Sequence, residues 1–182
     1  MINTIITFWF KDAGPEKWFI KDASFDQVIM ARFRGVYQDA RAGKCDHWRD
    51  TAQGALALIL VLDQFPRNMF RGDQESFVTD AKALETARQA IENGFDMSSD
   101  ITATMRGFFY LPLQHSENPD DQQDCVRLAK ERMKGDANYI DYAERHLNII
   151  ERFGRFPHRN AILNRVSTDA ERDYLSTPGA GF

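Results

Sequence analysis

The sequence contains few cysteines, and they form no cluster. Two of its 182 residues are cysteines, Cys45 and Cys125, and no CxxC pair is present. A disulfide framework or a zinc knuckle needs more cysteines at closer spacing. We therefore expect two reduced thiols that behave as small buried hydrophobic residues, as is usual in the cytoplasm.

The sequence also lacks an excess of positive charge and any long uncharged run. Its 23 Lys and Arg and 27 Asp and Glu residues are interspersed and give a net charge of −4. This balance does not indicate nucleic acid or an anionic membrane surface as the main partner. No uncharged segment reaches the roughly 18 residues of a membrane span, and the apolar start, Met1–Phe10, lacks the basic region and cleavage site of a signal peptide. We expect a cytoplasmic protein.

A strand-like alternation of apolar and polar residues is missing as well, whereas helical spacing recurs. The segment from about 48 to 64 is apolar on nearly all sides, which predicts a central helix. It should end at Phe65, because Pro66 disfavours helical geometry in the residue before it. Gly154 predicts the stop of a later helix, and Thr168 with Glu171 has the spacing of a capping box.

These patterns predict an all-α fold of about seven to nine helices, arranged as stacked hairpins or as a closed bundle. No linker, low-complexity tract or charge run divides the chain. We therefore expect a single domain over residues 1–182. A strict repeat of about 34 residues, which would indicate a regular solenoid, is absent.

Three polar segments follow apolar helices, and the first is Leu62–Arg71. Asp63 is placed to pair with Arg67, and Arg67 with Arg71 has the planar forks that clamp a carboxylate or phosphate. Asn68 lies between them. The alternative is that the arginines cap the carbonyls at the end of the preceding helix.

The second segment, Leu111–Glu117, brings a histidine, a hydroxyl and a carboxylate together as His115, Ser116 and Glu117. These groups suit general acid–base chemistry. The alternative is a buried histidine bonded to Glu117 that ties a loop to the core. Ser116 lacks the strand–turn–helix elbow of the common serine hydrolases, so we do not expect it to be a nucleophile.

The third segment, Glu151–Asn160, concentrates basic groups at a helix exit. Gly154 and Pro157 end the helix and fix the next turn, which displays the polar side chains that follow. An anion site is one interpretation, and capping of the helix by its arginines is the other. The displayed residues are Arg155, His158, Arg159 and Asn160, with His146 upstream on the same helix.

A metal site is a further interpretation, because His115, Glu117, His146 and His158 include the residue types that bind zinc. No two of the histidines have the i,i+4 spacing of a helical metal signature. We expect neither a metal nor another cofactor.

On four stretches the sequence resembles the bacterial family called domain of unknown function 924, whose members have a tetratricopeptide-like all-helical fold. No established activity follows from this resemblance. Lys11 stands where relatives have glycine, and Gln114 where an acid is common, so a role that needs a second carboxylate beside Glu117 is in doubt. The matching stretches are Phe8–Phe10, Ala57–Arg71, Tyr110–Glu117 and Ile149–Asn160, followed by Ser167 and Thr168.

We thus predict one polar pocket built from residues 63–71, 112–117 and 152–160, which binds a small anionic or carboxylate-bearing molecule. If it is an enzyme, His115 or His158 is the general acid or base, with Glu117 as its orienting partner. The expected ligand contacts are Arg67, Asn68, Arg155, Arg159 and Asn160. The alternatives are a non-catalytic module that binds a protein or peptide between helices, and a purely structural role for all three segments.

Overall fold

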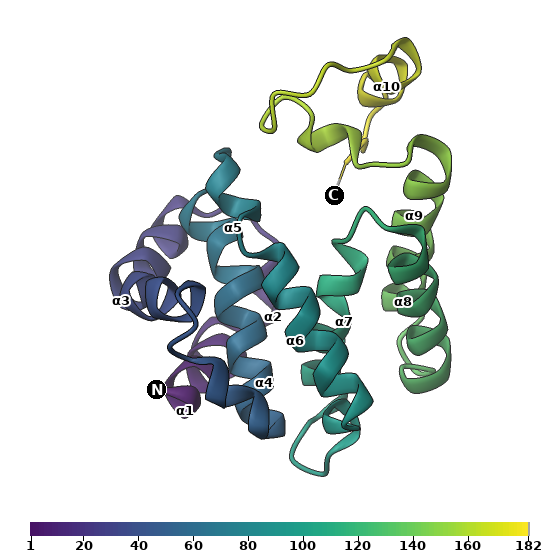
Figure 1. Ribbon diagram of the computed structural model, residues 1–182. Coiled ribbons are helices and arrows are strands. Elements are labelled where there is room, and N and C mark those ends of the chain that lie inside the picture. Colours follow the sequence, from purple (N-terminus) through teal and green to yellow (C-terminus); the bar gives the residue numbers. More distant parts are fainter. Residues whose placement is uncertain (182) are drawn as a thin grey trace. The chain divides into compact units, whose positions relative to one another are not determined.

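The computed structural model describes residues 1–181, and their regular structure is entirely helical (Figure 1). No strand occurs among these residues. The expected all-α class is confirmed. No described helix is long and apolar enough to cross a membrane.

The helices follow one another through short connections. The α-helices are α1 (Ile2–Thr7), α2 (Pro15–Trp18), α3 (Ala23–Arg41), α4 (Ala52–Ile59), α5 (Phe65–Met69), α6 (Asp80–Glu92), α7 (Ala103–Gln114), α8 (Pro119–Arg132), α9 (Ala137–Phe153) and α10 (Asp169–Leu175). Two π-helical segments, η1 (Phe8–Ala13) and η3 (Leu60–Gln64), continue α1 and α4. Short 3₁₀ turns are η2 (Asp46–Asp50), η4 (Gln74–Phe77), η5 (Phe95–Met97) and η6 (Pro157–Arg159).

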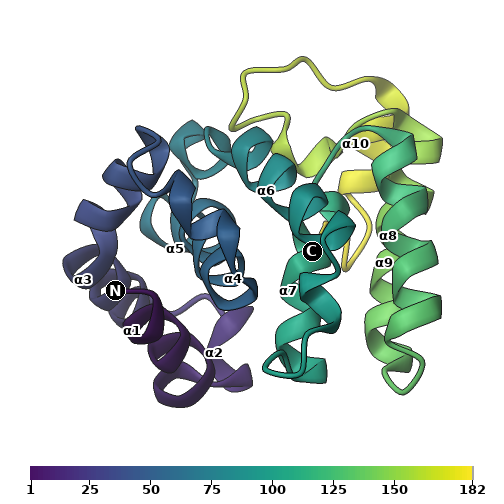
Figure 2. The same cartoon turned by 60° about the horizontal axis from the view of Figure 1, so that its bottom comes forward.

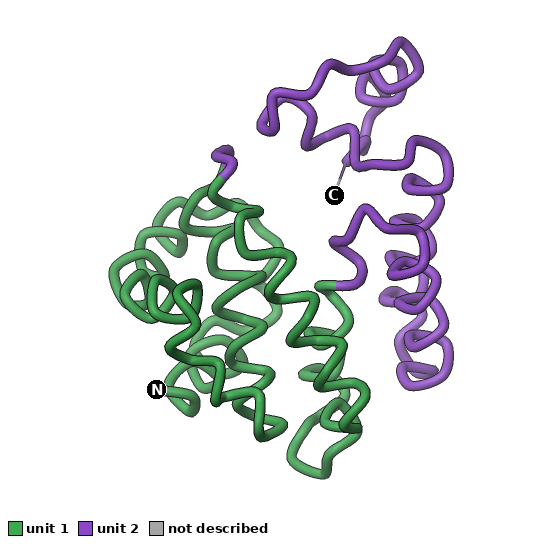
Figure 3. Tube along the Cα trace, viewed as in Figure 1, with its two compact units in different colours: residues 1–71, 75–112 green, residues 72–74, 113–182 purple. Residues whose placement is uncertain are grey.

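By its internal contacts the chain forms two compact units (Figure 3). Unit 1 comprises Met1–Arg71 and Glu75–Pro112, and unit 2 comprises Gly72–Gln74 and the chain from Leu113 onward. Helix α7 therefore begins in unit 1 and ends in unit 2. The single domain over residues 1–182 stays a prediction.

The centre of unit 1 is the apolar segment that the sequence places in the core, and every residue from Gly54 to Leu62 is buried. The predicted end of this helix at Phe65 is wrong, because Phe65 has helical φ and ψ of −59° and −40° and α5 follows without a break. Pro66 has no N–H for the carbonyl of Leu62, four residues earlier. The hydroxyl of Thr79 donates to that carbonyl instead, at 2.6 Å. The π-helical turn and this side-chain donor let the helix continue through the proline.

Aromatic side chains fill the rest of the unit 1 core around Trp9, which is fully buried. Its ring is stacked on Trp18 at 6.2 Å and meets Phe65 at 5.6 Å and Phe108 at 6.0 Å. The aromatic residues of the N-terminal segment therefore serve packing.

In unit 2, α8 and α9 lie side by side (Figure 2). Helix α9 ends at Gly154, whose φ of 68° is left-handed and whose N–H bonds to the carbonyl of Ile150. The predicted glycine stop is confirmed. The chain then runs through η6 to α10, and this return segment carries Arg155, His158, Arg159 and Asn160.

Candidate functional site

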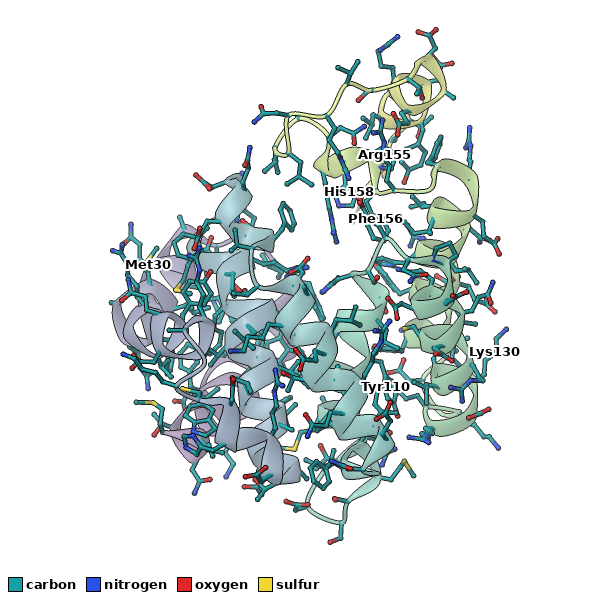
Figure 4. All side chains as sticks on the ribbon, viewed as in Figure 1. Met30, Tyr110, Lys130, Arg155, Phe156 and His158 are labelled. Carbon is teal, nitrogen blue, oxygen red and sulfur yellow. The ribbon has the colours of Figure 1, made fainter. Side chains whose placement is uncertain are left out.

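The second and third predicted segments meet within unit 2. The backbone N–H of Phe156 donates to Glu117 Oε1 at 2.8 Å, although 39 residues separate them. Figure 4 shows Phe156 and His158 on the side of the loop after α7, and Arg155 on the side of α10. The polar groups of residues 114–117 and 154–160 are therefore neighbours.

Arg165 holds the Glu117 carboxylate with both ends of its guanidinium. Nη1 donates to Oε2 at 2.7 Å and Nη2 to Oε1 at 3.0 Å, the two-bond geometry that favours arginine. Burial alone would raise the pKa of Glu117, but Arg165 and the Phe156 N–H bring that pKa below its ordinary value. Glu117 is an ionised anchor for the returning chain.

Arg155 points the other way, toward α10. Its Nε and Nη2 donate to the two oxygens of Glu171 at 2.6 and 2.8 Å, and Nη2 also bonds to the carbonyl of Val166. Glu171 accepts from the backbone of Thr168, whose hydroxyl in turn accepts from Glu171 N. The predicted capping box is confirmed, and the same carboxylate ties α10 to the end of α9.

Asn160 links the two carboxylate anchors. Its Nδ2 donates to Ser167 Oγ at 3.0 Å and to Glu171 at 3.3 Å, while its Oδ1 accepts from Arg165 Nε at 2.9 Å. It is almost fully buried. Arg155 and Asn160 therefore make internal bonds that hold the returning chain in place.

The ring of Phe156 is surrounded by basic side chains. The guanidinium of Arg159 lies over the ring, 4.6 Å from its centroid. The rings of His146 and His158 each lie 5.6 Å from Phe156 between centroids. Phe156 itself is fully buried, and Arg159 is 7% exposed. One aromatic ring thus gathers three of the basic residues singled out from the sequence.

His146 is a buried, neutral member of this cluster. Its Nδ1 lies 2.7 Å from the carbonyl of Tyr142, which can only accept, so Nδ1 carries the proton. Its Nε2 is then the ring nitrogen that can accept from the Gln114 amide, whose nitrogen lies 3.5 Å from Nε2 and 3.2 Å from Nδ1. The pKa of His146 is lowered to about 3, mainly by burial; the bond to the Tyr142 carbonyl opposes this shift, and the nearby His115, Arg159 and His158 add to it.

His158 and His115 are the partly exposed histidines of the cluster. Burial is the main cause that lowers the pKa of His158 to about 4, and Arg159 acts in the same direction while Glu117 opposes it. The C-terminal segment covers part of this ring, since a Cβ on Gly181 would lie 3.3 Å from His158 Cβ. At neutral pH His158 is therefore an uncharged base beside an arginine.

Ser116 belongs to the turn that shapes this region. Its hydroxyl donates to Asp121 Oδ2 at 2.7 Å and accepts from the N–H of Asn118. Gln122 Nε2 donates to the carbonyls of Leu113, Gln114 and Ser116 at the end of α7. These bonds stabilise the turn from which His115 and Glu117 project.

The first predicted segment lies in unit 1, where it makes internal ion pairs. Arg67 donates to both oxygens of Asp80, at 2.9 and 3.0 Å, and to the carbonyl of Asp63 at 2.6 Å. The predicted pairing of Asp63 with Arg67 is present at 3.2 Å. Asn68 and Arg71 both donate to Asp26 on α3. The shared pocket of all three segments stays a prediction.

Comparisons with known proteins agree with this fold. The family model described as bacterial protein of unknown function (DUF924) matches residues 5–179. The chain belongs to the DUF924 family. A solved structure of a protein of unknown function from Agrobacterium tumefaciens is 44% identical, has a TM-score of 0.90 and covers 96% of each chain. A comparison with curated proteins gives no match.

In this DUF924 protein Gln114 has a defined place beside His146. Its Oε1 accepts from the thiol of Cys125 at 3.9 Å, and its amide nitrogen faces the His146 ring. An ionised acid at position 114 has no proton to donate to His146 Nε2. Burial raises the pKa of Cys125 to about 12, so the thiol stays protonated.

Sequence reasoning missed Arg165 and the second role of Glu171. The capping box pointed to Glu171 as a local cap, but its bond to Arg155 spans 16 residues. Arg165 stands outside all three polar segments and has no motif that marks it. Among residues 1–181, no group of three or more His, Cys, Asp or Glu is arranged to hold a metal ion.

Proposed function

We propose that unit 2 binds a small anion, a carboxylate or a phosphate, at the basic cluster around Phe156. Arg159 and His158 are the proposed ligand contacts, with His115 at the partly exposed edge. The supporting observation is that Arg159, His146 and His158 all lie within 6 Å of the Phe156 ring centroid. Bonds to the charged guanidinium are the strong interactions available to such a ligand.

Two guanidinium groups act on Glu117 in this cluster, those of Arg165 and Arg159, and both lower its pKa. Both oxygens of Glu117 accept from Arg165. The depressed pKa values of His146 and His158 keep their rings neutral at pH 7. In this proposal the Arg159 guanidinium is therefore the charged donor that a bound anion meets beside the neutral rings.

His158 is the proposed acid–base group of the site. Its pKa of about 4 means that it is neutral at pH 7, and a nearby anion raises the pKa of a histidine. Binding of an anion therefore shifts His158 toward its protonated form, and protonated His158 can donate that proton to a reacting group. In this proposal Glu117 holds the turn, and Arg155 and Asn160 hold α10.

Of the two predicted kinds of partner, the small anion is the one that this cluster supports. A peptide groove, and a contribution of Arg67 and Asn68 to the same ligand, stay predictions. The two free, buried cysteines support the expected cytoplasmic location.

Isothermal titration calorimetry with inorganic phosphate and with citrate tests the proposal. The wild-type chain should bind at least one of them saturably at pH 7, and the same anion should raise its melting temperature by mass action. Repeating the titration in buffers of different ionisation enthalpy should show net proton uptake.

Two site variants and one control make this test specific. His158→Gln and Arg159→Gln should each weaken binding by at least about tenfold. His158→Gln alters a partly exposed side chain, so it remains informative if Arg159→Gln does not fold. Arg127→Gln on α8 removes an exposed arginine that pairs with Asp124 and Glu131, and it should bind normally. Saturable binding that His158→Gln leaves unchanged, or no binding of either anion, overturns the proposal.

A further inference from the structure

Arg165 joins the turn after α7 to the turn that carries His158 and Arg159. Besides its two bonds to Glu117, its Nη2 donates to the carbonyl of Phe156 at 3.0 Å. Its Nε donates to Asn160 Oδ1 at 2.9 Å, and its backbone N–H to the Asn160 carbonyl at 2.8 Å. All three guanidinium nitrogens are therefore used in internal bonds.

These bonds hold both ends of one short turn. His158 and Arg159 lie in η6, between Phe156 and Asn160, and Arg165 bonds to each of those flanking residues. Glu117 closes the loop, because it accepts from Arg165 and from the N–H of Phe156. The orientation of His158 and Arg159 thus depends on a residue that follows them in the chain.

We propose that Arg165 is a positioning residue for the anion site, which fixes the η6 turn so that His158 and Arg159 face one ligand. This inference rests on the proposed function. It assigns Arg165 no contact with the ligand, because its donors point to Glu117, Phe156 and Asn160.

The geometry requires the planar fork of arginine and not only a positive charge. Two of its nitrogens reach Glu117 while Nε reaches Asn160, and these directions are fixed by the guanidinium plane. Lysine can keep one ion pair with Glu117 but cannot satisfy Asn160 and the Phe156 carbonyl at the same time. Arg165→Lys therefore preserves the charge and loosens the turn.

The test compares Arg165→Lys with the wild type and with Arg127→Lys, the matched change at an exposed arginine of α8. Arg165→Lys should remain folded by circular dichroism and bind inorganic phosphate or citrate at least about tenfold more weakly, because small misplacements of binding groups are costly. Arg127→Lys should match the wild type.

Histidine NMR titration supplies a readout that general destabilisation does not move. In Arg165→Lys the pKa of His158 should rise from about 4 toward its ordinary value, because the loosened turn exposes the ring while the charge at residue 165 is unchanged. The pKa of His146 should stay near 3, since α9 holds that ring through the Tyr142 carbonyl.

The outcomes separate this inference from the proposed function. If the wild type binds an anion and Arg165→Lys binds it equally well, Arg165 does not position the site. If the wild type binds neither anion, the proposed function fails, and an unmoved pKa of His158 in Arg165→Lys then also overturns the positioning role. If Arg165→Lys does not fold, Glu117→Gln replaces it: the amide still accepts from Phe156 N but loses the two-bond pair, so binding should weaken similarly.

Discussion

The hydroxyl of Thr79 donates to the carbonyl of Leu62, the carbonyl that Pro66 cannot serve because proline has no N–H. The next carbonyl, that of Asp63, accepts from the guanidinium of Arg67. The Thr79 hydroxyl thus takes the place of the missing backbone donor at a proline within the central helix, and Arg67 adds a side-chain donor at the next carbonyl. This arrangement explains how a buried helix passes through Pro66.

Removing the Thr79 hydroxyl should destabilise unit 1. Thr79→Val keeps the shape of a side chain that is 3% exposed but leaves the Leu62 carbonyl without this donor, at a cost of about 1–3 kcal/mol. Thr79→Ser should retain most of the stability. Thr86→Val is the control, because the Thr86 hydroxyl donates to the Lys82 carbonyl, which the helix already supplies with a backbone donor. Urea unfolding monitored by circular dichroism measures the differences, and equal stability of Thr79→Val and the wild type contradicts the prediction.

Replacing Gly54 or Gly35 by alanine should change the stability of the protein in opposite directions. A Cβ at Gly54 would lie 2.2 Å from the Trp48 carbonyl, so Gly54→Ala forces the backbone apart and should cost about 1–3 kcal/mol or more. Gly35 lies in the middle of α3 with nothing within 4 Å of its Cβ position. Gly35→Ala should stabilise the protein by about 0.5–1 kcal/mol through helix propensity. Thermal unfolding of both variants measures the two changes in stability. A Gly54→Ala variant as stable as the wild type contradicts the prediction for Gly54.

The buried histidine should make the protein less stable in acid. The folded pKa of His146 is about 3, below the ordinary 6.5, so between these values the unfolded chain binds a proton that the folded chain does not. Stability contributed by neutral His146 is present above pH 6.5 and falls as the pH drops, by up to about 1.4 kcal/mol per pH unit. His146→Gln keeps a donor and an acceptor without titrating, and it should flatten the dependence of unfolding free energy on pH between 6 and 4. A wild-type His146 ring that titrates near 6.5 by NMR is incompatible with this prediction.

The Arg155–Glu171 ion pair should contribute more to stability than the exposed Arg172–Asp169 pair of α10. Glu171 is 2% exposed and accepts hydrogen bonds from Arg155, Thr168 and Asn160. A neutral amide has one acceptor oxygen and cannot accept all of these bonds. Glu171→Gln should therefore lower the melting temperature and speed proteolysis of the chain after α9. Asp169→Asn alters the exposed carboxylate in the same first turn of α10 and should have little effect. Equal melting temperatures for the two variants are the result that contradicts this prediction.

The predictions from sequence succeeded where the decisive contacts are close along the chain. Gly154 ends α9, Thr168 and Glu171 form the capping box, and Asp63 pairs with Arg67 one turn later. Each depends on a spacing of three or four residues, which a helix fixes by its own geometry. The end predicted at Phe65 failed because the donor that replaces the Pro66 N–H comes from Thr79, 17 residues from Leu62.

The candidate site likewise has features that the local sequence predicts and features that depend on tertiary contacts. The sequence by itself determined the all-α class, the family and the local concentration of His115, Glu117, His158 and Arg159, because composition and short motifs carry that information. Only the tertiary structure decided that Glu117 pairs with Arg165, 48 residues later in the sequence. The same holds for Arg155 and Glu171, which are 16 residues apart. Such pairings depend on where the folded backbone brings distant segments together. The sequence alone does not specify which of the protein's acids lies beside Arg155 or Arg165, because the packing of the helices determines it.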